Sequence, residues 1–104
     1  MTEPQLPPIT DHIARRFAAF HAAHPEVYAA FDKITRTMIA RGYERGSAYM
    51  VAEVIRWETS VNADHKDFKL NNDYRPLYAR MWMLNNPEHA DFFRTRVRQY
   101  RKDD

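Results

Sequence analysis

The stretch PEVYAAFDKITRTMIARG, residues 25–42, has the pattern of one complete amphipathic helix. Its apolar side chains recur every three or four residues and therefore share one helical face: Val27, Phe31, Ile34 and Met38. Pro25 suits the first position of a helix, and Gly42 suits its end. The whole chain has 104 residues with two glycines, so helices are expected on both sides of this stretch.

Four further helices are predicted from the same kinds of pattern. A cap at Thr10 or Asp11 starts the first of them. Ser47 caps a helix that is apolar nearly all round, which we expect to be the most buried one. Asp73 is expected to cap the next helix, and Asn86, followed by proline, to open the last. With the stretch above, the expected helices cover residues 11–23, 25–41, 47–58, 74–84 and 87 onward.

We therefore predict an all-α fold, a single compact domain of about five helices over residues 10–104. Residues 1–9 contain three prolines and are expected to form an extended or mobile N-terminal tail. Residues 59–73, between the third and fourth helices, are the least helical part. Two short strands at 59–61 and 68–70 would make a β-hairpin there, and an irregular loop is the alternative.

Composition excludes several classes of protein and site. The chain has no cysteine, which excludes disulfides and thiolate metal sites. It has no run of about eighteen apolar residues, which argues against a membrane span. Its first residues lack the basic and apolar regions of a signal peptide. We therefore expect a cytoplasmic protein.

Basic residues gather near the C-terminus, although the formal net charge is only +2. Residues 94–102 hold five basic side chains and no acidic one: Arg94, Arg96, Arg98, Arg101 and Lys102. On the predicted last helix these cations would contact nucleic-acid phosphates. The alternative is a solvated helix whose cations favour the negative end of the helix dipole.

A second candidate for nucleic-acid contact lies around the start of the fourth predicted helix: Lys69, Asn71, Asn72, Arg75 and Arg80. Asn and Arg side chains read adenine and guanine edges, and a helix N-terminus attracts phosphate. The order of helices is similar to a helix-turn-helix motif, but the gap of about fourteen residues is longer than the short turn of that motif. The alternative is an Asn-capped loop with surface arginines.

Arg56 and Trp57, on the third predicted helix, have two interpretations. In the structural one, Arg56 pairs with Glu53 and Trp57 belongs to the core. In the functional one, Arg56 and Trp57 stack on a nucleic-acid base. The structural interpretation is favoured, because a single aromatic residue on an apolar helix usually lies in the core.

The sequence contains no catalytic or metal-binding signature. Two glycines leave no phosphate-cradling loop, and Ser47 and Ser60 lie in no nucleophile-elbow context. His21 and His24 are three residues apart, but a metal site needs three or four converging ligands. We predict no catalytic residues, no metal and no cofactor.

Several spaced elements of the chain resemble a group of small uncharacterised proteins of bacteriophage and bacterial genomes. These elements are IRWET at 55–59, FKLNN at 68–72, YAR at 78–80, NP at 86–87 and FF at 92–93, followed by Arg96. The resemblance covers residues 20–96. It implies a compact phage or bacterial protein, either a regulator or a factor acting against the host, and it carries over no functional residue.

Two hypotheses for the function follow. The first is a small nucleic-acid-binding module, helix-turn-helix-like in the loose sense, with DNA rather than RNA as the expected partner and with phosphate contacts from the basic C-terminal helix. The second is a protein-interaction module, such as a phage factor that occupies a host protein, and the near-neutral net charge favours it. Exposure of Trp57, Trp82 or Met83 would favour a homodimer.

Overall fold

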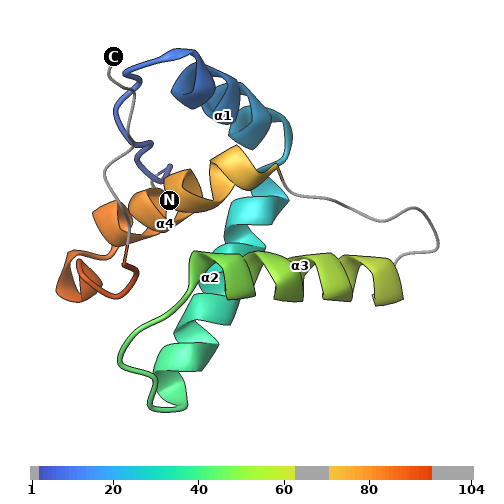
Figure 1. Ribbon diagram of the computed structural model, residues 1–104, viewed down its shortest axis with the longest axis vertical. Helices are drawn as coiled ribbons and strands as arrows, with labels where there is room; N and C mark the ends of the chain where they lie inside the picture. Colours follow the sequence, from blue (N-terminus) through green and yellow to red (C-terminus); the bar gives the residue numbers. More distant parts are fainter. Residues whose placement is uncertain (1–2, 63–70, 95–104) are drawn as a thin grey trace.

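The computed structural model of the protein describes residues 3–62 and 71–94 and contains four α-helices packed into one body (Figure 1). The helices are α1 (His12–Ala23), α2 (Pro25–Ala40), α3 (Ala48–Asn62) and α4 (Arg75–Asn85). Single 3-10 turns precede and follow α4 at Asn72–Tyr74 and Pro87–His89. Apart from one isolated bridge, the described residues form no β-structure, so the predicted all-α class is confirmed. Within these residues, no helix has both the length and the apolar character needed to cross a lipid bilayer.

Several helix ends lie where the local sequence predicts them. Asp11 Oδ1 accepts a hydrogen bond from the Ala14 N–H at 2.9 Å, which caps the start of α1. Ser47 Oγ accepts one from the Met50 N–H at 3.2 Å at the start of α3. After α2 the chain turns at Gly42, whose φ of 95° is readily adopted only by glycine.

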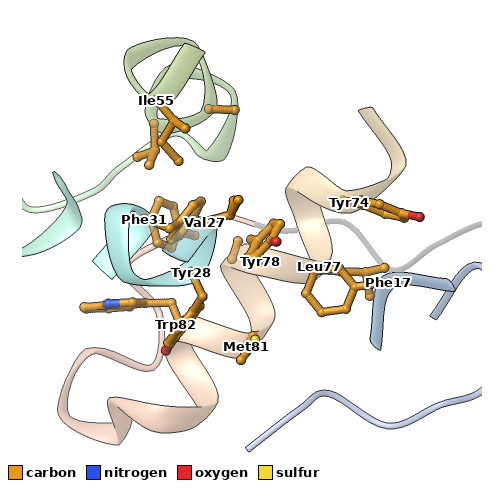
Figure 2. Close-up of a cluster of buried hydrophobic side chains, with 14 of the residues drawn as sticks. Phe17, Val27, Tyr28, Phe31, Ile55, Tyr74, Leu77, Tyr78, Met81 and Trp82 are labelled. Atoms are coloured by element: carbon orange, nitrogen blue, oxygen red, sulfur yellow. The ribbon is translucent and has the colours of Figure 1, made fainter. Parts of the chain in front are cut away.

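The most buried helix is α4, and the prediction that the third helix takes this position was wrong. Five side chains of α4 are almost fully enclosed: Leu77, Tyr78, Ala79, Met81 and Trp82. Figure 2 shows several of them meeting Phe17 of α1, with Phe31 of α2 and Ile55 of α3 in the same cluster. Helix α3 buries only one of its faces, because no other described element packs on its outer side and its C-terminal half extends away from the body (Figure 1). Leu84, near the end of α4, is exposed.

The first strand of the predicted hairpin does not form. Residues 59–61 continue α3, which ends at Asn62. Their β-branched and hydroxyl side chains have only slightly lower helix propensity, so a helix that is already formed extends through them at little cost. The second predicted strand, residues 68–70, lies outside the described residues.

The predicted last helix is absent from the part of it that the structure describes. Only the 3-10 turn Pro87–His89 forms, and the chain then turns at Ala90 and Asp91. Phe92 and Phe93 follow, and both are buried. Two consecutive side chains of a surface helix point about 100° apart, so an irregular backbone buries both of them better than a helix does.

Gly46 lets the connection between α2 and α3 approach this phenylalanine pair closely. Its N–H donates a hydrogen bond to the Phe92 carbonyl at 3.0 Å, and Gly46 forms a parallel bridge with Phe93. A Cβ at position 46 would overlap the Phe92 ring and lie 3.1 Å from Cε1 of Phe93. The absence of a side chain is therefore required at Gly46, whereas the positive φ is the requirement at Gly42.

A closed ring of hydrogen bonds joins α2 to the end of α4. Trp82 Nε1 and Arg36 Nε both donate to Asp32 Oδ1, each at 2.8 Å. Arg36 Nη2 donates to Asn86 Oδ1 at 2.7 Å, and Asn86 Nδ2 donates to the Trp82 carbonyl at 2.8 Å. Asn86 therefore does more than end a helix, because it completes the polar surroundings of a buried tryptophan.

The neighbouring asparagine holds the N-terminal segment. Asn85 Oδ1 accepts a hydrogen bond from the Gln5 N–H at 2.8 Å, and Asn85 Nδ2 donates one to the Gln5 carbonyl at 2.9 Å. Pro7, two residues further on, is buried. Residues 3–9 have no regular secondary structure, and the two bonds from Asn85 attach them to the end of α4.

Two core tyrosines have hydroxyls in contrasting surroundings. Burial and, to a smaller extent, the Asp32 carboxylate raise the pKa of Tyr28 to about 12, against the opposing effects of a hydrogen bond with Asn85 and of the Arg36 charge. Burial also raises the pKa of Tyr78, whose hydroxyl has no hydrogen-bond partner among the described residues. Tyrosine in the unfolded chain titrates near 10. The unfolded chain therefore releases protons that the folded chain keeps, so this stability is complete below pH 10 and is lost as the pH rises toward 12.

We expect Gly46→Ala to lower the free energy of unfolding by about 1–3 kcal/mol, because the added methyl group displaces the Phe92 ring from a packed core. A urea titration would show a lower midpoint at an unchanged slope. Gly42→Ala is a comparison in which the cost, about 1–2 kcal/mol, comes from the backbone alone, since no atom lies within 4 Å of its Cβ. Gly46→Ala combined with Phe92→Leu should lose less than the sum of the single changes. If the losses in the free energy of unfolding are additive, the methyl group added at Gly46 does not overlap the Phe92 ring.

We expect Tyr78→Phe to raise the free energy of unfolding at pH 7 by about 1 kcal/mol, because it removes a buried hydroxyl that has no partner. The same change should make the loss of stability between pH 10 and pH 12 shallower. Tyr28→Phe should also flatten this loss, but it should lower stability at pH 7, since the bond to Asn85 disappears. Urea midpoints across this pH range measure both effects. A Tyr78→Phe protein that is less stable at pH 7 would show that the hydroxyl is hydrogen-bonded.

Candidate functional site

Of the two asparagines before α4, Asn71 contributes to the fold through its side chain. Asn71 Oδ1 accepts a hydrogen bond from the Asp73 N–H at 2.8 Å and so caps the 3-10 turn that leads into the helix. Helix α4 then begins at Arg75 without a side-chain cap, so the predicted cap by Asp73 was wrong. Asn72 is exposed, and Lys69 lies outside the described residues.

Arg75 is engaged with α3 rather than directed into solvent. Its guanidinium lies over the Tyr49 ring, 4.4 Å from the ring centroid, and its Nη2 donates to Glu53 Oε2 at 3.3 Å. The Arg75 side chain is only 19% exposed. One turn further along the same side of α4, Ala79 is fully buried. These contacts hold α4 against α3.

Arg80 and Arg94 lie at other places on the surface. Arg80 is half-buried and lines a shallow groove of about 460 Å³ together with residues such as Pro7 and Leu84. Arg94 is exposed. Arg75 and Arg80 therefore face different elements, the one α3 and the other the N-terminal segment. The remaining predicted phosphate contacts lie outside the described residues: Arg96, Arg98, Arg101 and Lys102.

The described part of the molecule has no net charge. Residues 3–62 and 71–94 contain ten Lys and Arg side chains and ten Asp and Glu side chains. The formal charge of +2 thus belongs to the rest of the chain. A protein body without net charge lacks the long-range positive field with which nucleic-acid-binding domains usually attract a polyanion.

Trp57 lies on the surface, so the prediction that it belongs to the core was wrong. It is 67% exposed, and two other large side chains of α3 are exposed as well, Tyr49 by 59% and Met50 by 40%. With the half-buried Val54, they make an exposed apolar surface that we call the α3 patch: Tyr49, Met50, Val54 and Trp57. The sequence did contain a sign of this patch. A helix that is apolar all round and lies at the edge of a small domain has more apolar side chains than one packed face can bury.

Beside the α3 patch, α2 and α3 line a groove of about 350 Å³. Ile34 and Met38 of α2 and Val51 of α3 give it an apolar lining. Met50 and Val54 belong both to the groove and to the α3 patch, so the two form one continuous surface. The other residues that line the groove are polar, charged or aromatic: Lys33, Thr37, Arg41, Tyr43 and Glu58.

His21 and His24, three residues apart in the sequence, lie in different surroundings. His21 is buried, with its ring 5.8 Å from the Tyr28 ring, and His24 Nδ1 lies 3.3 Å from Glu26 Oε2 at the surface. Over residues 3–62 and 71–94 there is no group of three or more His, Asp or Glu side chains that could hold a metal ion.

We expect Arg75→Ala to lower the free energy of unfolding by about 1–2 kcal/mol, because it removes the contact with Tyr49 and the partner of Glu53. Arg94→Ala, at an exposed position, is the matched control and should change stability by less than about 0.5 kcal/mol. Urea unfolding of the three proteins measures the difference. If Arg75→Ala is as stable as Arg94→Ala, the contacts of Arg75 do not hold the two helices together.

No protein-family model, no curated protein and no solved structure matches this chain. The geometry of the α3 patch and of the adjoining groove is therefore the basis for the functional argument. The resemblance to small phage and bacterial proteins stays a prediction.

Proposed function

We propose that this protein is a small protein-interaction module whose binding surface is the α3 patch with the adjoining groove. The observation that carries the proposal is the exposure of Trp57 and Tyr49 on a helix whose other face is packed into the core. Trp, Tyr and Met are enriched at protein interfaces, and Trp and Tyr also among the residues that dominate binding. A contiguous exposed apolar surface usually marks such an interaction site.

The first half of α3, which carries Tyr49 and Met50, is held against the core. Val51 and Ile55 on the opposite face of α3 are buried in the core. Arg75 holds the helix from α4 through Tyr49 and Glu53. A partner would therefore meet Tyr49 and Met50 on a helix segment that is already positioned, which lowers the entropy cost of association. A factor of phage or bacterial origin that occupies a host protein is one form that such a module takes.

Nucleic-acid binding is the second candidate, and one observation favours it. Arg94 is exposed and begins the stretch at residues 94–102 that has five basic side chains and no acidic one. In this function the phosphate contacts come from Arg94, Arg96, Arg98 and Arg101. The described body adds little, since it has no net charge and Arg75 is engaged with α3.

Affinity capture from a nuclease-treated bacterial lysate tests the first proposal. We expect proteins captured by the parent chain to be reduced at least about tenfold with a Met50→Ser/Trp57→Ser variant, because truncating an interface centre costs about 2 kcal/mol or more. Leu84→Ser is the matched control, since Leu84 is similarly exposed but lies on α4. Far-ultraviolet circular dichroism and urea unfolding would verify that the variants stay folded.

Equal capture by the parent and by the Met50→Ser/Trp57→Ser variant would contradict an interaction through the α3 patch. Fluorescence anisotropy of labelled DNA and RNA at increasing salt concentration distinguishes nucleic-acid binding from the protein-interaction function. Nucleic acid would be favoured over protein as the partner if binding weakens with salt and is reduced by Arg94→Ala. Binding should also be unchanged in the Met50→Ser/Trp57→Ser variant.

A further inference from the structure

We infer that the groove beside the α3 patch binds an amphipathic helix with acidic side chains along one edge, an inference that rests on the proposed protein-interaction function. The groove lies between α2 and α3, which cross one another (Figure 1), and its lining includes Ile34, Met38 and Val51. Grooves of this kind take the apolar face of a helix, whose anchor residues recur at i, i+3 or i+4 and i+7.

Two cations that line the groove favour a partner with negative charge. Lys33 and Arg41 both line the groove and are exposed. Neither is paired with a carboxylate of the described residues. By contrast Arg36, on the same helix, is paired with Asp32 at 2.8 Å. The two cations of the groove are therefore available to carboxylates of a partner.

The spacing of these cations sets a register. Lys33 lies on α2 and Arg41 directly follows this helix, eight residues further along the chain, which corresponds to about 12 Å of helix. A partner helix that runs along this edge would place acidic side chains seven or eight residues apart to reach both cations. Opposite charges at an interface margin mainly increase the association rate and the specificity, while the apolar anchors in the groove provide most of the affinity.

The groove does not suit a nucleic acid. Its lining is largely apolar, so it offers little to the charged phosphate backbone that dominates nucleic-acid binding. A second copy of the chain is the other occupant to be tested, since α3 itself is apolar and carries Glu53 and Glu58. Sedimentation velocity at high protein concentration would show whether the parent chain forms a dimer and whether Val54→Asp dissociates it. A dimer that Val54→Asp dissociates would overturn the inference of a foreign acidic helix.

Selection from a displayed library of random helical peptides of 16 to 20 residues tests the inference directly. The protein is used as the full chain in three forms: the parent, Lys33→Glu/Arg41→Glu, and Arg15→Glu/Arg16→Glu. The third form has the same change of charge on exposed residues of α1, away from the groove. We expect peptides selected on the parent to be acidic, with apolar residues at helical spacing, and to bind Lys33→Glu/Arg41→Glu at least tenfold more weakly. The Arg15→Glu/Arg16→Glu form should bind them within about twofold of the parent.

Peptides in which the acidic residues are replaced with lysine should in turn regain binding to the Lys33→Glu/Arg41→Glu form. Selected peptides without an acidic bias, or binding that the reversal of charge at Lys33 and Arg41 leaves unchanged, would overturn the inference. So would a selection that enriches no peptide. In these cases the capture experiment decides the broader question. If capture still depends on Trp57, the interaction function holds and only the partner chemistry is wrong; if it does not, the function fails as well.

Discussion

The enclosure of the Trp82 indole is the constraint on which the rest of the structure depends. Its ring is fully buried and packs against Phe92 and Phe93, with centroids 6.0 and 5.9 Å away. A buried indole needs an acceptor for its N–H, and Asp32 provides it. The Asp32 carboxylate also accepts a hydrogen bond from Arg36 on the same helix. The bonds from Trp82 to Asp32 and from Arg36 to Asn86 fix the end of α4 against α2. The Trp82 side chain combines apolar packing with a hydrogen bond of fixed direction. Together these specify both the distance of α4 from α2 and its rotation about its own axis.

The same indole determines where α3 begins. By packing on Trp82, the Phe92 and Phe93 rings bring their backbone next to Gly46, which accepts this approach because it has no side chain. Ser47, the following residue, caps α3. Helix α3 thus starts at a point fixed by the core and runs outward, so that its first half packs on α2 and its far end does not. The exposed Trp57 is a consequence of this geometry: the helix continues beyond the body that could cover it.

Some local features of the structure could be predicted from the sequence, and the features that depend on distant residues could not. The cap by Asp11 and the turn at Gly42 depend on residues within a few positions, so the pattern contains them. The relative burial of α3 and α4 does not follow from periodicity, because both helices are rich in apolar residues and only the packing decides which one is central. Arg75 shows the same limit, since a basic residue near a helix start suits phosphate binding equally well until Tyr49 and Glu53 are found beside it.

The site was predicted less completely than the fold for a related reason. Trp57 has the residue type of a core side chain, and only the absence of a described element over α3 gives it a different role. The energetics indicate what this exposure can achieve. Fully burying a large apolar side chain contributes about 1.5–3 kcal/mol. Tyr49, Met50 and Trp57 are 59%, 40% and 67% exposed, so covering what remains of them provides roughly 2.5–5 kcal/mol. Association costs about 4–15 kcal/mol in lost translational and rotational freedom. The α3 patch alone therefore binds weakly, and a lasting complex requires a partner that also fills the groove beside it.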